Sequence, residues 1–101
     1  MTIQELQYSL PWGLGYGAHF VSSTVKYKNF QHALLHVVKA AGKLSAIVED
    51  ADHSREDYFN TIEVQKYLAD LVICAMRMAN TSPTGTIDLQ SSVIHRLESK
   101  N

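Results

Sequence analysis

The fold is decided by the stretch FQHALLHVVKAAGKLSAIV, which spans residues 30–48. Apolar residues recur in it at intervals of three and four, which is the periodicity of a helix with one buried face. Asn29 stands just before the first apolar residue, where an N-cap is expected. The pattern predicts a long helix from about residue 30 to residue 49. Its apolar face consists of Phe30, Ala33, Leu34, Val37, Val38, Ala41, Leu44 and Val48.

Two further helices are predicted on the C-terminal side of this stretch. Residues 60–80 repeat the same periodicity, and Asn60 followed by Glu63 has the spacing of a capping box. The sequence TSPTG then ends the pattern. A last helix, capped by Thr86 or Asp88, is expected to end near residue 99. The side chains that it is expected to bury are Leu89, Val93, Ile94 and Leu97.

The first 28 residues are predicted to form an arm outside the helical core. Pro11 and three glycines interrupt this stretch, and its aromatic side chains are expected to pack against the core or a partner chain. These aromatic residues are Trp12, Tyr16, Phe20 and Tyr27. Before Pro11, residues 2–8 are expected to form a short helix with Thr2 as its cap and Glu5 three residues on.

Length and composition indicate a single domain. The 101 residues, of which 46% are hydrophobic, are enough for one core and too few for two. We therefore expect one all-α domain over residues 1–101. It is a bundle of three main helices over residues 29–101, preceded by the arm of residues 1–28. A formal net charge of −1 excludes the overall basic field of a dedicated nucleic-acid-binding protein.

The number of cysteines and the distribution of apolar residues indicate the cellular compartment of the protein. Cys74 is the single cysteine, so no internal disulfide can form, which is typical of a reducing environment. The N-terminus lacks a basic segment followed by an apolar one, and no apolar run approaches the roughly 18 residues needed to span a bilayer. These features predict a cytoplasmic protein without a membrane segment.

Two polar stripes run along the two longest predicted helices. The first helix carries a basic stripe at spacings of four, three and four, which places its members on one side. This basic stripe consists of His32, His36, Lys39 and Lys43. The second helix carries a mixed stripe at the same kind of spacing. This mixed stripe consists of Glu63, Tyr67, Asp70, Cys74 and Arg77. If the two helices pack with the stripes facing each other, cations meet two carboxylates.

The residues around these stripes resemble a known family. The segments KAAGKL at residues 39–44 and YLADLVI at residues 67–73 are similar to the MazG-like branch of the all-α nucleoside triphosphate pyrophosphatases. The similarity extends over residues 28–101. It implies a helical bundle that assembles into homodimers or homotetramers. It also implies hydrolysis of nucleoside triphosphates to monophosphate and pyrophosphate, with magnesium held by four carboxylates from two helices.

Most of the carboxylates that this resemblance implies are replaced. The glutamates of the family's first helix fall at Lys43 and at Ala40 or Lys39, and the first acid of the family's Glu-x-x-Asp falls at Tyr67. Asp70 alone matches, so the resemblance makes it the candidate catalytic residue and magnesium ligand. One carboxylate cannot supply the oxygen shell of magnesium. We therefore expect a nucleotide-handling protein whose magnesium-dependent catalysis is lost or altered.

Two interpretations of the replaced site remain open. In the first, the ammonium of Lys43 takes over the electrostatic role of magnesium beside Asp70, and the hydroxyl of Tyr67 donates a hydrogen bond to the same carboxylate. In the second, the clustered cations bind phosphate directly, together with a basic residue and an asparagine near the ends of the helices. The candidates for binding substrate phosphates are Lys39, Lys43, Tyr67, Arg77, Asn80, Arg96, Lys100 and Asn101.

Other metal sites and another class of function are also consistent with the sequence. Glu63 is a second candidate ligand beside Asp70. His32 and His36 have the spacing for two nitrogens on one transition metal, with Asp52 as a third ligand. The alternative function is a non-catalytic structural or regulatory helical oligomer, in which the polar stripes form internal ion pairs. A small domain buries a limited area, which favours an oligomer in either case.

Overall fold

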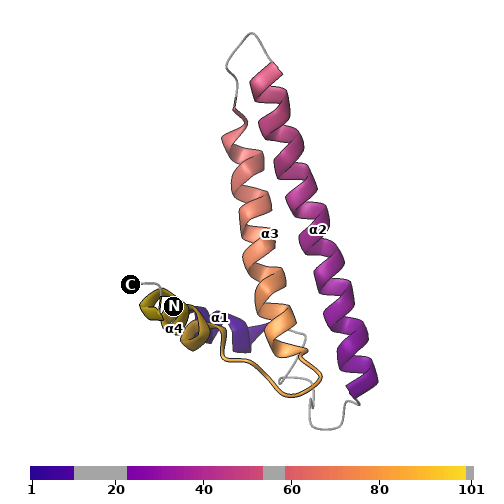
Figure 1. Cartoon of the computed structure of the whole chain (residues 1–101), viewed down its shortest axis with the longest axis vertical. Coiled ribbons are helices and arrows are strands. Elements are labelled where there is room, and N and C mark those ends of the chain that lie inside the picture. The colour runs from indigo at the N-terminus through magenta and orange to yellow at the C-terminus, as the bar shows by residue number, and fades with distance from the viewer. Residues whose placement is uncertain (11–22, 54–58, 100–101) are drawn as a thin grey trace.

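The computed structural model of the chain describes residues 1–10, 23–53 and 59–99, and this described part is entirely helical (Figure 1). The all-α prediction is confirmed, and no strand occurs among these residues. The helices, in chain order, are α1 (Ile3–Ser9), α2 (Ser23–His53), α3 (Thr61–Asn80) and α4 (Leu89–Ser99).

Helices α2 and α3 lie side by side as an antiparallel hairpin that forms the long axis of the molecule (Figure 1). Small side chains are buried along it: Ala33 and Ala40 from α2 are 1% and 5% exposed, and Cys74 from α3 is 6% exposed. Small residues let the two backbones approach closely. None of the described helices is long and apolar enough to cross a bilayer.

Helix α2 is longer than the predicted helix at both ends, since it begins at Ser23 and ends at His53. The start was predicted too late because Asn29 is a residue type that favours the N-cap, although it lies inside the helix here. At the other end, no glycine or proline stops the helix after residue 49. Tyr27 therefore belongs to α2 rather than to the arm. The other aromatic residues of the predicted arm lie outside the described residues.

The caps predicted for the other three helices are confirmed, whereas Asn29, the predicted cap of the first long helix, lies inside α2. At α1, the Oγ1 of Thr2 accepts a hydrogen bond from the backbone N–H of Glu5 at 3.1 Å, and both halves of the capping box are present. At α3, the Oδ1 of Asn60 accepts from the backbone N–H of Glu63 at 3.0 Å. At α4, Asp88 caps the helix, because its Oδ1 accepts from the third N–H of that helix at 3.2 Å. Each cap satisfies a backbone donor that the helix itself leaves free.

A buried polar junction joins α1 to the end of α3 and the start of α4. Gln7 is fully buried, and its Nε2 donates to the Oδ1 of Asn80 at 3.0 Å and to the carbonyl oxygen of Ile87 at 2.7 Å. The Oε1 of Gln7 accepts from the backbone N–H of Leu89 at 3.1 Å. In return, the Nδ2 of Asn80 donates to the carbonyl oxygen of Gln7 at 2.8 Å. One side-chain amide thus ties three elements together.

We expect Gln7→Leu to lower the free energy of unfolding by about 3 kcal/mol. Leucine has a similar volume, but it removes the three hydrogen bonds that the Gln7 side chain makes with the Oδ1 of Asn80, the carbonyl of Ile87 and the N–H of Leu89. Removing one partner of a buried hydrogen bond costs about 1–3 kcal/mol. Denaturant unfolding followed by circular dichroism measures the change. The control is Gln65→Leu at an exposed position of α3, for which a change within about 0.5 kcal/mol is expected. Equal effects of the two substitutions would contradict the structural role of the junction.

Helix α4 does not join the hairpin as a third bundle helix, which corrects the predicted arrangement. It lies beside α1, away from α2 (Figure 1). The Nε2 of Gln4 on α1 donates to the Oδ2 of Asp88 at 2.9 Å, which helps to hold α4 there. Val93, Ile94 and Leu97 are 40%, 49% and 59% exposed, so their predicted burial within the chain was wrong.

The turn before α4 accounts for this arrangement. Gly85 has φ +129°, a conformation that L side chains rarely adopt, and it redirects the chain after α3. The backbone N–H of Ile87 then donates to the carbonyl oxygen of Ala79 at 2.9 Å. This hydrogen bond holds the segment between the two helices against the end of α3, and α4 extends from there toward α1.

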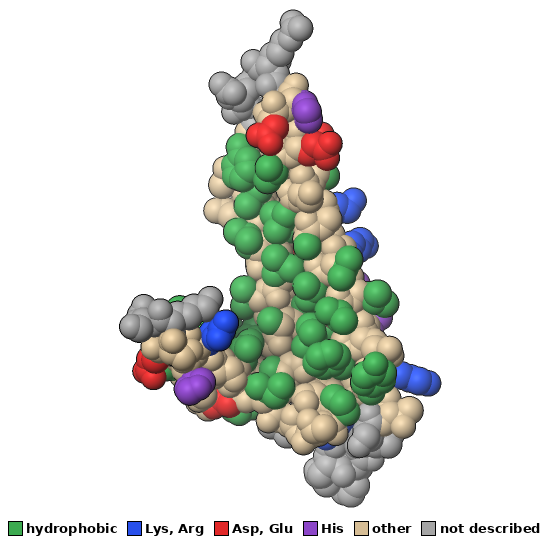
Figure 2. Space-filling model, viewed as in Figure 1, with side chains coloured by type: hydrophobic (Ala, Val, Ile, Leu, Met, Phe, Trp, Pro, Cys, Tyr) green, Lys and Arg blue, Asp and Glu red, His purple; other side chains and the backbone are tan. Residues whose placement is uncertain are grey.

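A broad apolar surface covers one face of the hairpin (Figure 2). Leu34 and Val38 of α2 are 42% and 63% exposed, and Leu68 and Val72 of α3 are each 50% exposed. We call these four side chains the apolar face. The chain exposes 7,325 Å², whereas a compact monomer of 11.3 kDa exposes about 5,700 Å². Its radius of gyration of 16.3 Å likewise exceeds the value of about 13 Å for a compact domain of this length.

Candidate functional site

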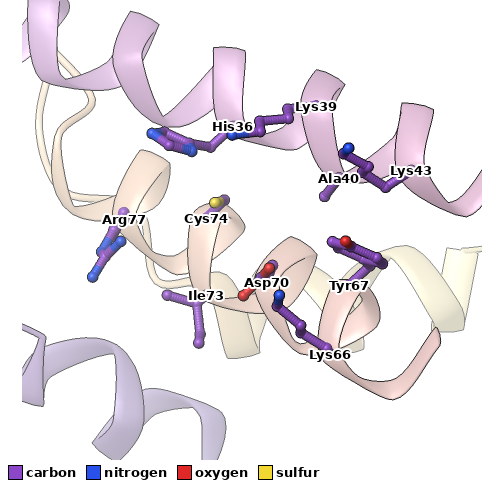
Figure 3. Close-up of a pocket in the computed structure, with 10 residues that line it drawn as sticks. All are labelled: His36, Lys39, Ala40, Lys43, Lys66, Tyr67, Asp70, Ile73, Cys74 and Arg77. Atoms are coloured by element: carbon purple, nitrogen blue, oxygen red, sulfur yellow. The ribbon is translucent and has the colours of Figure 1, made fainter. Parts of the chain in front are cut away.

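A cavity of about 500 Å³ lies between α2 and α3 (Figure 3). This volume is within the range of roughly 300–1,000 Å³ that is usual for small-molecule sites. The residues that line it are His36, Lys39, Ala40 and Lys43 from α2, and Lys66, Tyr67, Asp70, Ile73, Cys74 and Arg77 from α3. The cavity is open to solvent along one side of the hairpin.

Helical periodicity explains why these residues meet. On α2 the lining positions are separated by three and four residues, so the members of the basic stripe from His36 to Lys43 share one side. On α3 the positions from Tyr67 to Arg77 are separated in the same way. The two predicted stripes therefore face each other across the hairpin. The predicted site residues that line the cavity are His36, Lys39, Lys43, Tyr67, Asp70 and Arg77.

The cavity carries an excess of positive charge. Its formally charged lining groups are one carboxylate, from Asp70, and four cations, from Lys39, Lys43, Lys66 and Arg77. The lysine side chains are exposed and Arg77 is half-buried. A concave site lined by one sign of charge attracts ligands of the opposite sign. The electrostatics of the cavity therefore favour an anion.

Lys43 and Asp70 do not form the predicted ion pair. Lys43 lies on the α2 wall and Asp70 on the α3 wall (Figure 3), and no ion pair joins them within the described part of the chain. The structure therefore does not support the interpretation in which Lys43 neutralises Asp70 in place of magnesium. Lys39 and Lys43 line the α2 wall of the cavity.

Lys66 lines the cavity but was not predicted as a site residue. Its Nζ lies 5.3 Å from the centroid of the Tyr67 ring, which is a cation–π distance. The available signal was a second stripe on α3 at spacings of four, three and four. That stripe consists of Lys66, Asp70, Ile73 and Arg77. Because the cavity spans more than one row of helix positions, both α3 stripes contribute to it.

Cys74 lies at the floor of the cavity as a buried free thiol. Burial raises the pKa of the Cys74 thiol above its ordinary value, while the positive charge of Arg77 lowers it to a smaller extent and the carboxylate of Asp70 raises it. The thiol therefore stays protonated at neutral pH. A protonated, buried thiol is a poor nucleophile, so Cys74 acts as a small packing residue.

Several predicted site residues lie away from the cavity. Asn80 takes part in the buried junction with Gln7, and Arg96 is exposed on α4. Glu63 lies in the first turn of α3, where its negative charge interacts favourably with the helix dipole. Its backbone N–H donates to the capping side chain of Asn60. None of the three lines the cavity. The predicted phosphate ligands Lys100 and Asn101 lie outside the described residues.

The lining residues do not fit magnesium. This hard cation takes oxygen ligands and is usually bound by one or two carboxylates plus substrate phosphates. In the cavity, the single carboxylate of Asp70 shares the lining with four cationic side chains, whose charges repel a dication. Glu63, the second predicted ligand, does not reach the cavity.

The predicted three-ligand site of His32, His36 and Asp52 is corrected by the length of α2. Asp52 lies 16 residues beyond His36 on the same helix, which corresponds to about 24 Å along the axis. Asp52 therefore cannot share a metal with the two histidines of its own chain. The described residues contain no group of three or more His, Cys, Asp or Glu side chains that could hold a metal ion.

Comparison with known proteins finds no family model, no curated protein and no solved structure that matches this chain. The chemistry of the site therefore follows from its own side chains. Four cationic residues, a tyrosine and one carboxylate line an open cavity. Such a group of donors can bind and orient an anion with several oxygen atoms.

Proposed function

We propose that the chain is a MazG-like nucleotide-handling protein that binds the phosphate groups of a nucleotide in the α2–α3 cavity. In this proposal magnesium-dependent hydrolysis to monophosphate and pyrophosphate is lost. The observation that carries it is that four cationic side chains and a single carboxylate line one cavity of about 500 Å³. Lys43, and Lys39 in one of the two alignments, fall where the MazG-like resemblance implies acidic residues. At these positions a group that would bind a metal is replaced by one that binds phosphate.

The arrangement of the cations supports a polyphosphate in particular. Lys39 and Lys43 are one helical turn apart on one wall, and Lys66 and Arg77 are on the facing wall. A guanidinium offers a fork of donors that matches two phosphate oxygens, whereas ammonium groups act as point charges. A chain of phosphates with three or four negative charges would engage both walls at once. A single phosphate group would reach fewer of these side chains.

The same lining supports the loss of catalysis. Hydrolysis of a phosphoanhydride requires charge neutralisation together with an activated water molecule. The cations can provide part of the neutralisation. Asp70 is the one carboxylate that could accept a proton from water, and no second carboxylate in the cavity helps to place a metal beside it. Binding without turnover is the function that these residues favour.

Thermal denaturation with ATP tests the proposal. Without magnesium and with excess EDTA, ATP at one hundred times its dissociation constant should add about 2.7 kcal/mol to the stability of the folded chain. That corresponds to a rise in Tm of roughly 13 °C for a domain of this size. Adenosine, which carries no phosphate, serves as the control and should leave Tm unchanged. Stabilisation that requires magnesium, or release of pyrophosphate from ATP, would refute the proposal.

The homo-oligomer that the resemblance implies is part of the proposal. A second copy would cover the apolar face of the hairpin and form a bundle of four long helices. A standard interface buries roughly 800 Å² on each partner. The exposed apolar side chains of α2 and α3 would supply part of this area. A tetramer would use additional apolar side chains, such as those of α4.

The alternative, a structural or regulatory oligomer without a ligand, draws on the same apolar face. It requires that the polar stripes serve internal ion pairs. The missing ion pair between Lys43 and Asp70 in the described part of the chain counts against it. A dimer that fails to bind ATP would favour this alternative.

A further inference from the structure

Two histidines form a close pair on the cavity side of α2. The Nε2 atoms of His32 and His36 are 3.1 Å apart. Their ring centroids are 4.6 Å apart, and the rings are inclined at 72° to each other. Both side chains are exposed, and His36 also lines the α2–α3 cavity. The pair is not used by the phosphate-binding role proposed above.

The geometry of the pair suits a shared metal ion. Zinc and related divalent ions bind imidazole nitrogen at about 2.0–2.1 Å, so two nitrogens 3.1 Å apart would subtend an angle of about 100° at the metal. That angle lies between the values for tetrahedral and square or octahedral coordination. Residues four apart on a helix hold this separation without any change of backbone. A hydrogen bond between two neutral rings gives the same distance, so experiment must separate the two cases.

We propose that His32 and His36 bind a divalent transition metal, with its remaining coordination positions open to water and to an anion in the cavity. Imidazole nitrogen selects ions such as Zn²⁺, Ni²⁺ and Cu²⁺ over magnesium and calcium, which prefer oxygen. Two protein ligands leave at least two further positions unfilled. Because His36 lines the cavity, some of these positions are adjacent to the bound anion.

The surroundings of the pair determine which ion binds most tightly. Lys39 lies one turn further along the basic stripe, and its charge opposes any dication. An ion that forms strong bonds to nitrogen overcomes this repulsion best. Cu²⁺ binds nitrogen ligands more tightly than Zn²⁺ does. An anion bound to the lysines offsets the same repulsion and can supply an oxygen ligand. Metal and anion should therefore strengthen each other's binding.

Calorimetric titration of the full chain with Cu²⁺ or Zn²⁺ alone tests the metal site. We expect one site per chain, with Cu²⁺ bound more tightly than Zn²⁺. His32→Asn and His36→Asn should each weaken it at least about tenfold, since even changes to groups behind metal ligands cost 10–100-fold. His53→Asn and His95→Asn serve as matched controls at exposed positions of α2 and α4, and they should change the affinity less than twofold. All four positions are exposed, and circular dichroism verifies that each variant is folded.

Loss of affinity in all four variants, or in none, would overturn the metal site, as would the absence of binding to the unaltered chain. The link to the anion rests on the proposed function and is measured separately. Filling the metal site should make the unaltered chain bind ATP at least about fivefold more tightly. In His36→Asn, the same addition of metal should leave the affinity for ATP unchanged. Metal binding without any ATP binding would refute the proposed function but leave the metal site standing. ATP binding without metal binding would refute the metal site but leave the proposed function standing.

Discussion

The double variant Lys39→Glu, Lys43→Glu is expected to bind ATP at least about 100-fold more weakly than the unaltered chain in the absence of magnesium. Both lysines line the cavity from α2. A hydrogen bond to a charged group contributes about 1.5–3 kcal/mol, and the low end applies because both side chains are exposed. Two such losses amount to about 3 kcal/mol, which is more than 100-fold in the dissociation constant. Isothermal calorimetry in EDTA measures the difference.

A matched control separates this local effect from a general change of charge. Lys28→Glu, Arg96→Glu alters the net charge by the same amount at exposed positions of α2 and α4 that do not line the cavity. We expect this control to change ATP affinity less than threefold, because exposed charges more than a Debye length apart are largely screened at physiological salt. Equal weakening by both variants would show that ATP responds to the overall charge and not to the cavity. Unchanged binding by the cavity variant would contradict the assigned site.

The double variant Leu34→Glu, Val38→Glu is expected to convert a dimer into a monomer. These side chains belong to the apolar face and are 42% and 63% exposed in the isolated chain. Covering a side chain that is about half exposed contributes roughly 1 kcal/mol, so four such side chains in a two-fold dimer contribute about 4 kcal/mol. Their loss raises the dissociation constant about 1,000-fold before the cost of burying carboxylates is added. Sedimentation equilibrium should report twice 11.3 kDa for the unaltered chain and 11.3 kDa for the variant.

The control for the dimer places the same two charges elsewhere. Ser91→Glu, Ser92→Glu lies on α4, where both positions are exposed, and acidic groups in the first turn of a helix are favourable. This control should keep the mass of the dimer. A monomeric mass for the unaltered chain at high micromolar concentration would contradict the proposed assembly. It would not affect the phosphate-binding prediction, because the cavity is formed within one chain.

Much of the fold follows from apolar periodicity and capping chemistry. Three- and four-residue spacing located α2, α3 and α4, and Thr2, Asn60 and Asp88 marked where α1, α3 and α4 begin. The place of α4 could not be predicted in this way. Periodicity shows which side of a helix is apolar, but it does not show which element covers that side. For α4 the direction is set by the turn at Gly85 and by contacts to α1, which are far away in the sequence.

The candidate site was predictable to a similar degree. Spacing along each helix placed Lys39, Lys43 and Asp70 on the correct sides, and the cavity lies where the two stripes face each other. Pairing across the hairpin was not predictable, because it depends on how far one helix slides along the other. Lys43 consequently lies opposite α3 without reaching Asp70. Asn80 was assigned to phosphate because of its position near the end of α3, yet that position is where α1 contacts the hairpin.

The most direct measurement is calorimetric titration of the unaltered chain with ATP in excess EDTA, followed by the same titration with magnesium in place of EDTA. The cationic cavity predicts saturable binding of one ATP per chain in EDTA, weakened by added salt. It also predicts equal or lower affinity with magnesium, because the metal neutralises part of the phosphate charge that the lysines attract. The absence of binding in EDTA, or binding that appears with magnesium alone, would contradict the assignment of the cavity as a metal-independent phosphate site.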